Sequence, residues 1–301
     1  MTWAAFALVL LSATLDASWN LLAKKERMTV PLYATALASN AFLFSWYLAF
    51  SPVPLASLPA TFWKPCALAV AGAVLFALAL PLAYRFLDMT TAYPMIRALP
   101  ILFVAGATSA FGIGKPLSGA AKVGMALVFA GCLLVPLETF GDFRPGRFLR
   151  RGFPFVLLVA AGTTVYTIFD SEAVAALRAL EAKPGSHSAA SLAYYEIRAL
   201  LVVLGMWGCI FVSPNLRAEA AVVLRTRLKS AVTIGLGSSL AYMAILAAMP
   251  LAGNVAYIHA FRQIGLAIGL LGGVLVLHER VTVPKVAGVT LILGGLAASV
   301  I

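Results

Sequence analysis

Charged residues are scarce in this chain of 301 residues, where 11% are charged and 62% are apolar. A soluble globular domain carries about a quarter charged residues, so the composition excludes a soluble protein. The core of a bilayer offers no water to satisfy backbone groups, and long apolar segments in it must therefore be helices. The composition predicts an all-α integral membrane protein.

Cysteine and histidine are also scarce, with three residues of each type. The cysteines, Cys66, Cys132 and Cys209, stand singly in apolar stretches without metal or redox spacing, and we interpret them as inert core thiols. The histidines are scattered, and the sequence holds no Ser-His-Asp set, no Asp-rich metal cluster and no nucleotide-binding loop. We therefore expect no enzyme activity, no metal and no cofactor.

Apolar runs between charged or Pro/Gly-rich breaks predict ten membrane-spanning helices, since one span needs roughly 20 residues. The polar stretch 139–152 divides them into two five-helix halves, residues 1–138 and 153–301. The predicted spans lie near 2–22, 30–50, 66–86, 91–112, 119–138, 153–172, 189–212, 229–249, 254–277 and 282–301.

An internal repeat supports this division. The stretch Ala92–Gly131 reappears without gaps at Ala256–Gly295, after a shift of 164 residues. Five helices is an odd number, so the second half enters the membrane from the opposite side, which predicts an inverted repeat. The identical positions are Ala92/Ala256, Tyr93/Tyr257, Leu102/Leu266, Gly124/Gly288, Leu127/Leu291 and Gly131/Gly295.

The net charge of +11 comes from lysines and arginines in the short loops between spans, a pattern that sets orientation in a membrane. Fourteen of these cations fall in loops one, three, five, seven and nine, and five fall on the opposite face. The bias predicts that both termini lie outside the cytoplasm. It also argues against nucleic acid as a partner.

Polar residues follow one face of the first span, where Ser12, Asp16 and Asn20 are spaced four residues apart beside Trp19. The stripe either lines a central path or forms a hydrogen-bonded seam with other helices. Small residues recur on the last two spans and predict close helix packing. They are Gly265, Gly269, Gly272, Gly273, Gly288, Gly294 and Gly295.

Two arginines lie roughly 9–15 Å into the bilayer, at about 1.5 Å per residue. Arg97 follows Tyr93 by four residues, and Arg262 lies in the corresponding part of the second half. Arginine binds planar anions through two parallel hydrogen bonds, so the pair suits a carboxylate, phosphate or phosphonate. The alternative is an internal salt bridge to Asp16, Asp170 or Glu196. The neighbours of Arg262 are Tyr257, His259 and Gln263.

Further polar groups lie on spans six and seven. Tyr166 is placed to face a cavity, whereas Asp170 lies near the end of its span, where a solvated carboxylate is expected. Glu196 and Arg198 point to different sides of one helix, so each needs a partner on another helix. The candidates for carrying a proton are Asp16, Glu196 and His259.

Three short motifs stand out along the chain. The first is Ser18-Trp19-Asn20 with Lys24 at the helix end. The second is Ala92-Tyr93-Pro94 followed by Arg97 and Pro100, and the third is the turn Leu277-His278-Glu279-Arg280. These motifs resemble those of EamA-like permeases of the drug/metabolite transporter superfamily. The resemblance implies ten helices in two inverted five-helix repeats, and export of amino acids or similar metabolites. The chain departs from relatives that carry histidine at the position of Asp16 and Gly-Glu at Gly114-Lys115.

Together these features predict a secondary active transporter in the inner membrane of a bacterium. The arginines favour a substrate with an acidic group, such as an amino acid or organic acid, and Trp19, Asn20, Tyr93, Tyr166, Tyr257 and Gln263 are expected to line its site. Without a nucleotide-binding loop, energy must come from an ion or substrate gradient, and coupling to protons is favoured. The expected partners are the bilayer and a small molecule, with the protein a monomer or homodimer. The competing functions are a membrane-embedded enzyme acting on lipid-linked phosphates, and a flippase or scaffold subunit.

Overall fold

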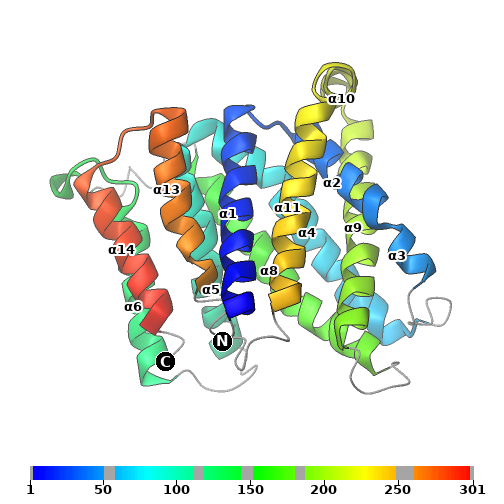
Figure 1. The fold of residues 1–301 in the computed structure, drawn as a ribbon, viewed down its shortest axis with the longest axis horizontal. Helices are drawn as coiled ribbons and strands as arrows, with labels where there is room; N and C mark the ends of the chain where they lie inside the picture. The colour runs from blue at the N-terminus through cyan, green and yellow to red at the C-terminus, as the bar shows by residue number, and fades with distance from the viewer. Residues whose placement is uncertain are drawn as a thin grey trace. The chain divides into compact units, whose positions relative to one another are not determined.

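The computed structural model describes residues 3–50, 58–110, 118–143, 152–179, 187–248 and 261–298. These residues form helices joined by short turns, with no strand among them (Figure 1). Thus the prediction of an all-α protein is confirmed.

Six helices are long and apolar enough to cross a bilayer. They are α1 (Trp3–Lys25), α4 (Ala60–Phe86), α5 (Met89–Ala110), α8 (Phe153–Arg178), α9 (His187–Val212) and α11 (Leu228–Ala248). Three further helices are apolar but shorter: α6 (Gly119–Leu134), α13 (Ile264–Leu277) and α14 (Val283–Ala298). The chain is therefore a helical membrane protein.

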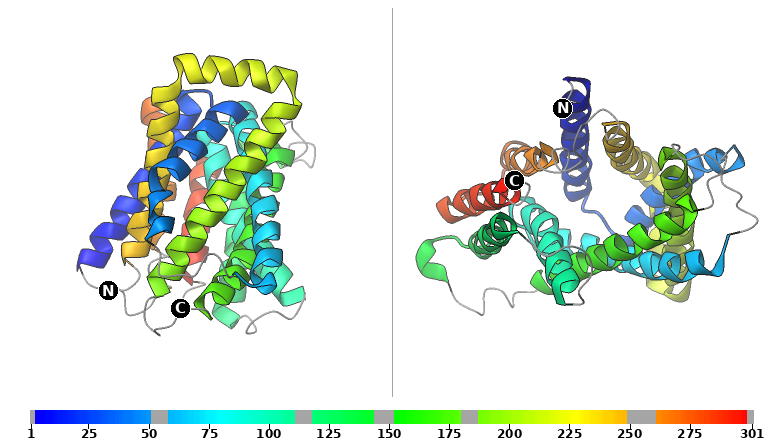
Figure 2. Two further views of the ribbon diagram at one scale, coloured as in Figure 1. Left: turned by 90° about the vertical axis from the view of Figure 1, so that its right-hand side faces the viewer. Right: turned by 90° about the horizontal axis from the view of Figure 1, so that it is seen from below.

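The remaining helices are α2 (Val30–Phe44), α3 (Trp46–Ala49), α10 (Pro214–Thr226) and the 3-10 turn η2 (Phe140–Asp142). The predicted span 30–50 is thus two helices that meet at Ser45, whose hydroxyl donates to the Phe42 carbonyl. The helix α10 crosses the end of α9 at a steep angle (Figure 2). Only its Ala220 and Val223 are buried, as expected for a helix that is apolar on one side.

Hydroxyl side chains mark where several helices begin. Thr29, Ser118 and Ser213 accept the backbone N–H groups of Leu32, Ala121 and Leu216, at 3.4, 3.1 and 3.5 Å. Each hydroxyl satisfies one of the N–H groups that the first turn of a helix leaves without a partner.

The described helices form two compact units. Unit 1 comprises residues 1–28, 82–160 and 237–301, and unit 2 comprises residues 29–81 and 161–236. Each unit takes segments from both halves of the sequence. The two compact units therefore do not coincide with the two halves on either side of 139–152, because helices from both halves pack together within each unit.

In unit 1, α6 and α14 lie side by side (Figure 1) and approach through glycines. A Cβ atom on Gly131 would lie 2.5 Å from the Gly288 carbonyl oxygen, and a Cβ atom on Gly295 would lie 2.5 Å from that of Gly124. Residue numbers fall along one helix as they rise along the other, so the pair is antiparallel. Gly288 and Gly295 pack closely as predicted, whereas Gly294 has nothing within 4 Å of its Cβ position.

Glycines also bring α13 against α5 and α1. A Cβ atom on Gly269 would lie 2.5 Å from the Tyr93 ring, and one on Gly273 would lie 2.6 Å from the Thr90 side chain, so α5 and α13 are antiparallel. A Cβ atom on Gly265 would lie 3.2 Å from the Ala13 carbonyl oxygen of α1. These approaches confirm the prediction that small residues of this span serve packing.

The junction between α4 and α5 is held from two sides. The ammonium of Lys24 donates to the carbonyl oxygens of Tyr84 at 2.5 Å and Leu87 at 2.7 Å, which cap the end of α4. The carboxylate of Glu279 accepts the N–H groups of Met89 and Thr90, both at 2.7 Å, and caps the start of α5. A positive charge at a helix C-terminus and a negative charge at an N-terminus both suit the helix dipole.

The turn that carries Glu279 is formed by a left-handed residue. His278 ends α13 with a φ of 55°, and the N–H of Glu279 then donates to the Gly273 carbonyl at 3.0 Å. Lys285, counted above among the loop cations, is instead a buried residue of α14 whose ammonium donates to Thr90 Oγ1 at 2.9 Å. Two motifs that carry the family resemblance, Lys24 and the turn after α13, therefore act here as helix caps.

Unit 2 contains α2, α3, α9, α10 and the adjoining parts of α4, α8 and α11. Its helices α4 and α8 meet at Gly72 and Gly162, where a Cβ atom on Gly162 would lie 2.6 Å from the Gly72 carbonyl oxygen. A buried cluster of α4, α8 and α9 side chains includes Phe62, Cys66 and Leu177. Cys66 and Cys132 are buried as predicted, but Cys209 is exposed on the helix surface.

Candidate functional site

A cluster of charged side chains in unit 1 is centred on Asp16, halfway along α1. Asp16 Oδ2 is in contact with Arg97 Nη2 from α5, and Asp16 Oδ1 lies 3.6 Å from Nη2 of Arg262, which directly precedes α13. One carboxylate thus pairs with two guanidinium groups from different helices. The ion-pair alternative for the two arginines is what the structure contains, with Asp16 as the shared partner.

Neutral donors complete the surroundings of Asp16. The Tyr93 hydroxyl donates to Oδ2 at 2.7 Å, and the Trp19 indole N–H lies 3.4 Å from Oδ1. Tyr93 and Arg97 are four residues apart on α5, so both project towards α1 from one face. The Arg97 guanidinium also lies over the Tyr93 ring, 5.5 Å from its centroid.

The three charged groups differ in their access to solvent. The Asp16 side chain is 8% exposed, whereas those of Arg97 and Arg262 are 28% and 23% exposed. Two partly exposed guanidinium groups therefore share one buried carboxylate.

The rest of the polar stripe on α1 holds helices together. The Ser12 hydroxyl donates to the Ala241 carbonyl of α11 at 2.6 Å. The Asn20 amide donates to the Asp16 carbonyl at 2.8 Å, and its oxygen accepts the Tyr84 hydroxyl at 2.6 Å. The outer residues of the stripe therefore form the predicted seam, and only the central carboxylate joins the charged cluster.

Other residues predicted for this site have different outcomes. Gln263 lies between Arg262 and α13, and its side chain makes no capping hydrogen bond to the first turn of α13. Tyr257 and His259 lie outside the described residues. Tyr166 and Glu196 belong to unit 2.

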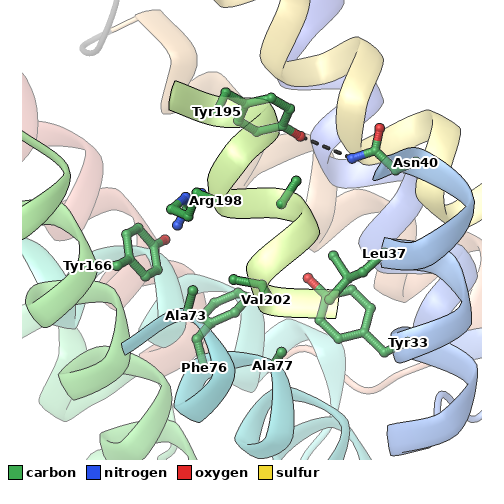
Figure 3. Close-up of a pocket in the computed structure, with 11 residues that line it drawn as sticks. Tyr33, Leu37, Asn40, Ala73, Phe76, Ala77, Tyr166, Tyr195, Arg198 and Val202 are labelled. Atoms are coloured by element: carbon green, nitrogen blue, oxygen red, sulfur yellow. Dashed lines mark hydrogen bonds between the residues drawn. The ribbon is translucent and has the colours of Figure 1, made fainter. Parts of the chain in front are cut away.

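Unit 2 contains a cavity of about 120 Å³ between α2, α4, α8 and α9 (Figure 3). The polar groups at its wall come from three tyrosines, one arginine and one asparagine, and the rest of the wall is apolar. The lining residues are Tyr33, Leu37, Asn40, Ala73, Phe76, Ala77, Tyr166, Tyr195, Arg198, Ala199 and Val202.

Arg198 is the charged residue of this cavity. Its Nη1 lies 3.6 Å from Asp170 Oδ2, and Asp170 also accepts a hydrogen bond from the Tyr194 hydroxyl. The expectation of a solvated carboxylate at Asp170 is thus wrong, because neighbouring α9 brings a cation and a phenol to it. The Arg198 guanidinium lies over the Tyr166 ring at 5.1 Å from its centroid.

Sequence reasoning selected Tyr166 for a cavity and missed the remaining polar residues of the lining. A signal was present in the spacing. Tyr33, Leu37 and Asn40 share one face of α2, and Tyr195, Arg198 and Val202 share one face of α9. The Asn40 amide donates to the Tyr195 hydroxyl at 3.1 Å, which joins these two faces.

Glu196 is 2% exposed, and its Oε1 has no hydrogen-bond partner among the described residues. The expectation that a second helix would supply a partner is met for Arg198 and not, within the described residues, for Glu196. Burying an ionised carboxylate without partners in a membrane interior costs several kcal/mol, and protonation of Glu196 would avoid that cost. The described residues contain no group of three acidic, histidine or cysteine side chains suited to a metal ion.

No protein-family model matches the chain. No curated protein matches it either. Fourteen chains of solved structures match. One, described as "Crystal structure of protein", is 17% identical, with a TM-score of 0.54 over 99% of this chain and 95% of that chain. At this identity the likeness shows that the two share a fold and nothing further.

Proposed function

We propose that the chain is a secondary active transporter of a small anionic metabolite, built from ten membrane-spanning helices in two inverted five-helix repeats. The observation that carries the proposal is the buried Asp16 carboxylate shared by Arg97 and Arg262. Charged groups inside a membrane protein usually line a substrate or ion path, or pair with one another. Here two cations pair with one shared carboxylate.

Packing in unit 1 supports the inverted repeat. The shift of 164 residues relates α5 to α13 and α6 to α14, and each of these pairs is antiparallel. The same shift maps the contact of Gly124 with Gly295 onto that of Gly288 with Gly131, with the two helices exchanged. Contacts that exchange in this way are produced by a two-fold axis between the partners.

The charge balance supports an anionic substrate. A carboxylate or phosphate that reaches the cluster can bind the exposed edge of one guanidinium while Asp16 retains the other. In the empty state Asp16 neutralises the arginines, and in the loaded state the substrate shares that role. The resemblance to EamA-like permeases agrees with amino acids or organic acids as substrates, and the charges of the loops favour an orientation with both termini outside the cytoplasm of a bacterium.

Coupling to a proton gradient is part of the proposal. Two buried carboxylates of the described residues are candidates for carrying the proton. Asp16 is shared by two arginines, and Glu196 has an Oε1 atom without a hydrogen-bond partner. His259 is a further candidate from the sequence. Protonation of Asp16 would release both arginines, which links proton uptake to the charge of the substrate site.

Transport by purified protein in liposomes tests the proposal. A panel of radiolabelled amino acids, dicarboxylates and inorganic phosphate is offered with and without an imposed proton gradient. Arg97→Ala and Arg262→Ala are each expected to reduce uptake of the transported anion at least about tenfold, equivalent to about 1.4 kcal/mol or more of lost binding. Arg217→Ala, which removes an arginine of α10, is the control and should transport normally.

Two results would overturn the proposal. One is the absence of uptake for every anion of the panel by folded wild-type protein. The other is normal uptake by both arginine variants, which would leave the Asp16 cluster a purely structural ion pair.

A further inference from the structure

The cavity of unit 2 is lined by polar and apolar side chains. Figure 3 shows Tyr195 and Asn40 at one end, with Arg198 beside them. Phe76, Ala73 and Ala77 lie at the opposite end, close to Val202. Two tyrosine rings also lie towards this end, since Tyr166 packs against Phe76 with ring centroids 6.0 Å apart and Tyr33 lies beside Ala77. A single ligand in this space would therefore meet a guanidinium and an amide at one end, and mainly aliphatic and aromatic side chains at the other.

The fixed charge of the lining favours an acidic group. Arg198 contributes a guanidinium, and the Asp170 carboxylate opposite it is already engaged by Arg198 and by the Tyr194 hydroxyl. Arg198 Nη1 lies 3.6 Å from Asp170 Oδ2, which is longer than a charge-assisted hydrogen bond of about 2.7–2.9 Å. These two atoms therefore form an ion pair without a short hydrogen bond between them. A ligand cation here would be placed against Arg198, whereas a carboxylate would be attracted to it.

Asn40 gives an independent indication that a polar group belongs in the cavity. This side chain is 3% exposed, and its Oδ1 has no hydrogen-bond partner among the described residues. A buried amide oxygen or N–H left without a partner costs about 1–3 kcal/mol. The amide oxygen and nitrogen can be exchanged by a flip, but either orientation leaves one half of the amide unsatisfied.

The size of the cavity limits the ligand. Its volume of about 120 Å³ is well above the roughly 10–15 Å³ that one water requires. It falls below the range of about 300–1,000 Å³ that is usual for drug-sized ligands. Small alanines at positions 73, 77 and 199 leave this space, and a larger side chain at any of them would fill it.

From these features we infer that the cavity between α2, α4, α8 and α9 is a binding site for a small monocarboxylate with a short apolar chain. The carboxylate lies at Arg198, and at its other edge Asn40 is flipped, so that Nδ2 donates to the carboxylate while Oδ1 accepts the Tyr195 hydroxyl. The chain lies against Phe76, Ala77 and Val202. This site is contained in unit 2, is distinct from the Asp16 cluster, and does not depend on the transport proposal.

Thermal unfolding of the full-length protein in detergent tests the inference with acetate, butyrate and hexanoate as probes. Butyramide and butylammonium serve as uncharged and oppositely charged analogues, and chloride keeps the ionic strength constant. Butyrate near saturation is expected to raise the melting temperature by about 2–4 °C, because a ligand that binds only the folded state stabilises it. Butyramide and butylammonium are expected to leave it unchanged.

Four variants assign the effect to the cavity. Ala77→Leu fills the space, and the double variant Asp170→Asn/Arg198→Gln removes both charges together, so neither is left alone. Both should lose the response to butyrate. Leu204→Ala, on the same helix as Arg198 but 68% exposed, should keep it. Arg97→Ala, in unit 1, reports whether butyrate binds at the Asp16 cluster instead. If the double variant does not fold, Ala77→Leu decides the question.

The opposite results are equally distinct. The inference is wrong if no carboxylate stabilises the wild-type protein, if butylammonium stabilises it as well as butyrate, or if Ala77→Leu responds like the wild type. A response lost only in Arg97→Ala would place the carboxylate at the Asp16 cluster, which supports the proposed function while removing this second site. If the wild-type protein transports no anion of the panel but keeps its response to butyrate, the proposed function is wrong and the site in unit 2 is retained.

Discussion

Two neighbouring glycines of α14 offer a stringent test of the packing described for unit 1. In Gly295→Ala the new Cβ atom would lie 2.5 Å from the Gly124 carbonyl oxygen, whereas in Gly294→Ala it would have nothing within 4 Å. Both substitutions remove the same backbone freedom of glycine, which favours alanine in a helix by about 0.5–1 kcal/mol. The difference between the variants therefore isolates the steric conflict.

The magnitude follows from the geometry. Ordinary contact begins near 3.4 Å, so α6 and α14 must separate by about 0.9 Å at Gly295, the difference between 3.4 and 2.5 Å. A gap of 0.5–1 Å forfeits about a quarter to a half of each dispersion contact along the interface. Overpacking of this kind costs about 1–3 kcal/mol. We expect Gly295→Ala to be less stable than Gly294→Ala by that amount.

The repeat adds a second expectation. Gly131 corresponds to Gly295 and makes the equivalent approach, 2.5 Å from the Gly288 carbonyl. Gly131→Ala should therefore match Gly295→Ala within about 0.5 kcal/mol. The two sites are seven residues apart on each helix, about 10 Å, and one separation of the helices relieves both conflicts. The double variant should cost less than the sum of the single variants.

The measurement is the unfolding free energy in detergent, obtained from denaturant titration of each variant with circular dichroism and tryptophan fluorescence. Retention of helix content before the transition shows that each variant folds. Equal stabilities of Gly294→Ala and Gly295→Ala would refute the glycine contact between α6 and α14. Full additivity of Gly131→Ala and Gly295→Ala would refute the shared, symmetric interface.

Two further predictions concern carboxylates, Glu279 at the start of α5 and the buried Glu196. Glu279→Ala removes both acceptors at the start of α5 and should lower the unfolding free energy by about 1–3 kcal/mol. Glu279→Gln keeps one acceptor, so its unfolding free energy should fall by roughly half as much. Equal losses for the two variants in the same titration would contradict capping through both oxygens. Glu196→Gln gives up no hydrogen bond found among the described residues, and a neutral amide is less costly to bury than a carboxylate, so its melting temperature should equal or exceed that of the wild type. A fall of more than about 1 kcal/mol in its stability would show that Glu196 has an essential partner.

Much of the local structure could be predicted from residue spacing alone. Runs of about 20 apolar residues predict helices because a bilayer leaves no other way to satisfy the backbone, and the long helices α1, α5 and α9 fall where those runs lie. The stripe Ser12, Asp16 and Asn20 follows from the helical period. The break at Ser45 within the predicted span 30–50 was missed, because the run stays apolar across it.

The sequence by itself determined the class of protein, most of the helices and the positions of Asp16, Arg97 and Glu196 within them, since these depend on composition and on periods within one segment. The tertiary structure alone decided how those charges are used. Asp16 meets arginines 81 and 246 residues away, and Arg198 meets Asp170 while Glu196, two residues earlier, meets no described partner. A helical period fixes which face a side chain occupies, but only the packing of helices fixes what lies opposite that face.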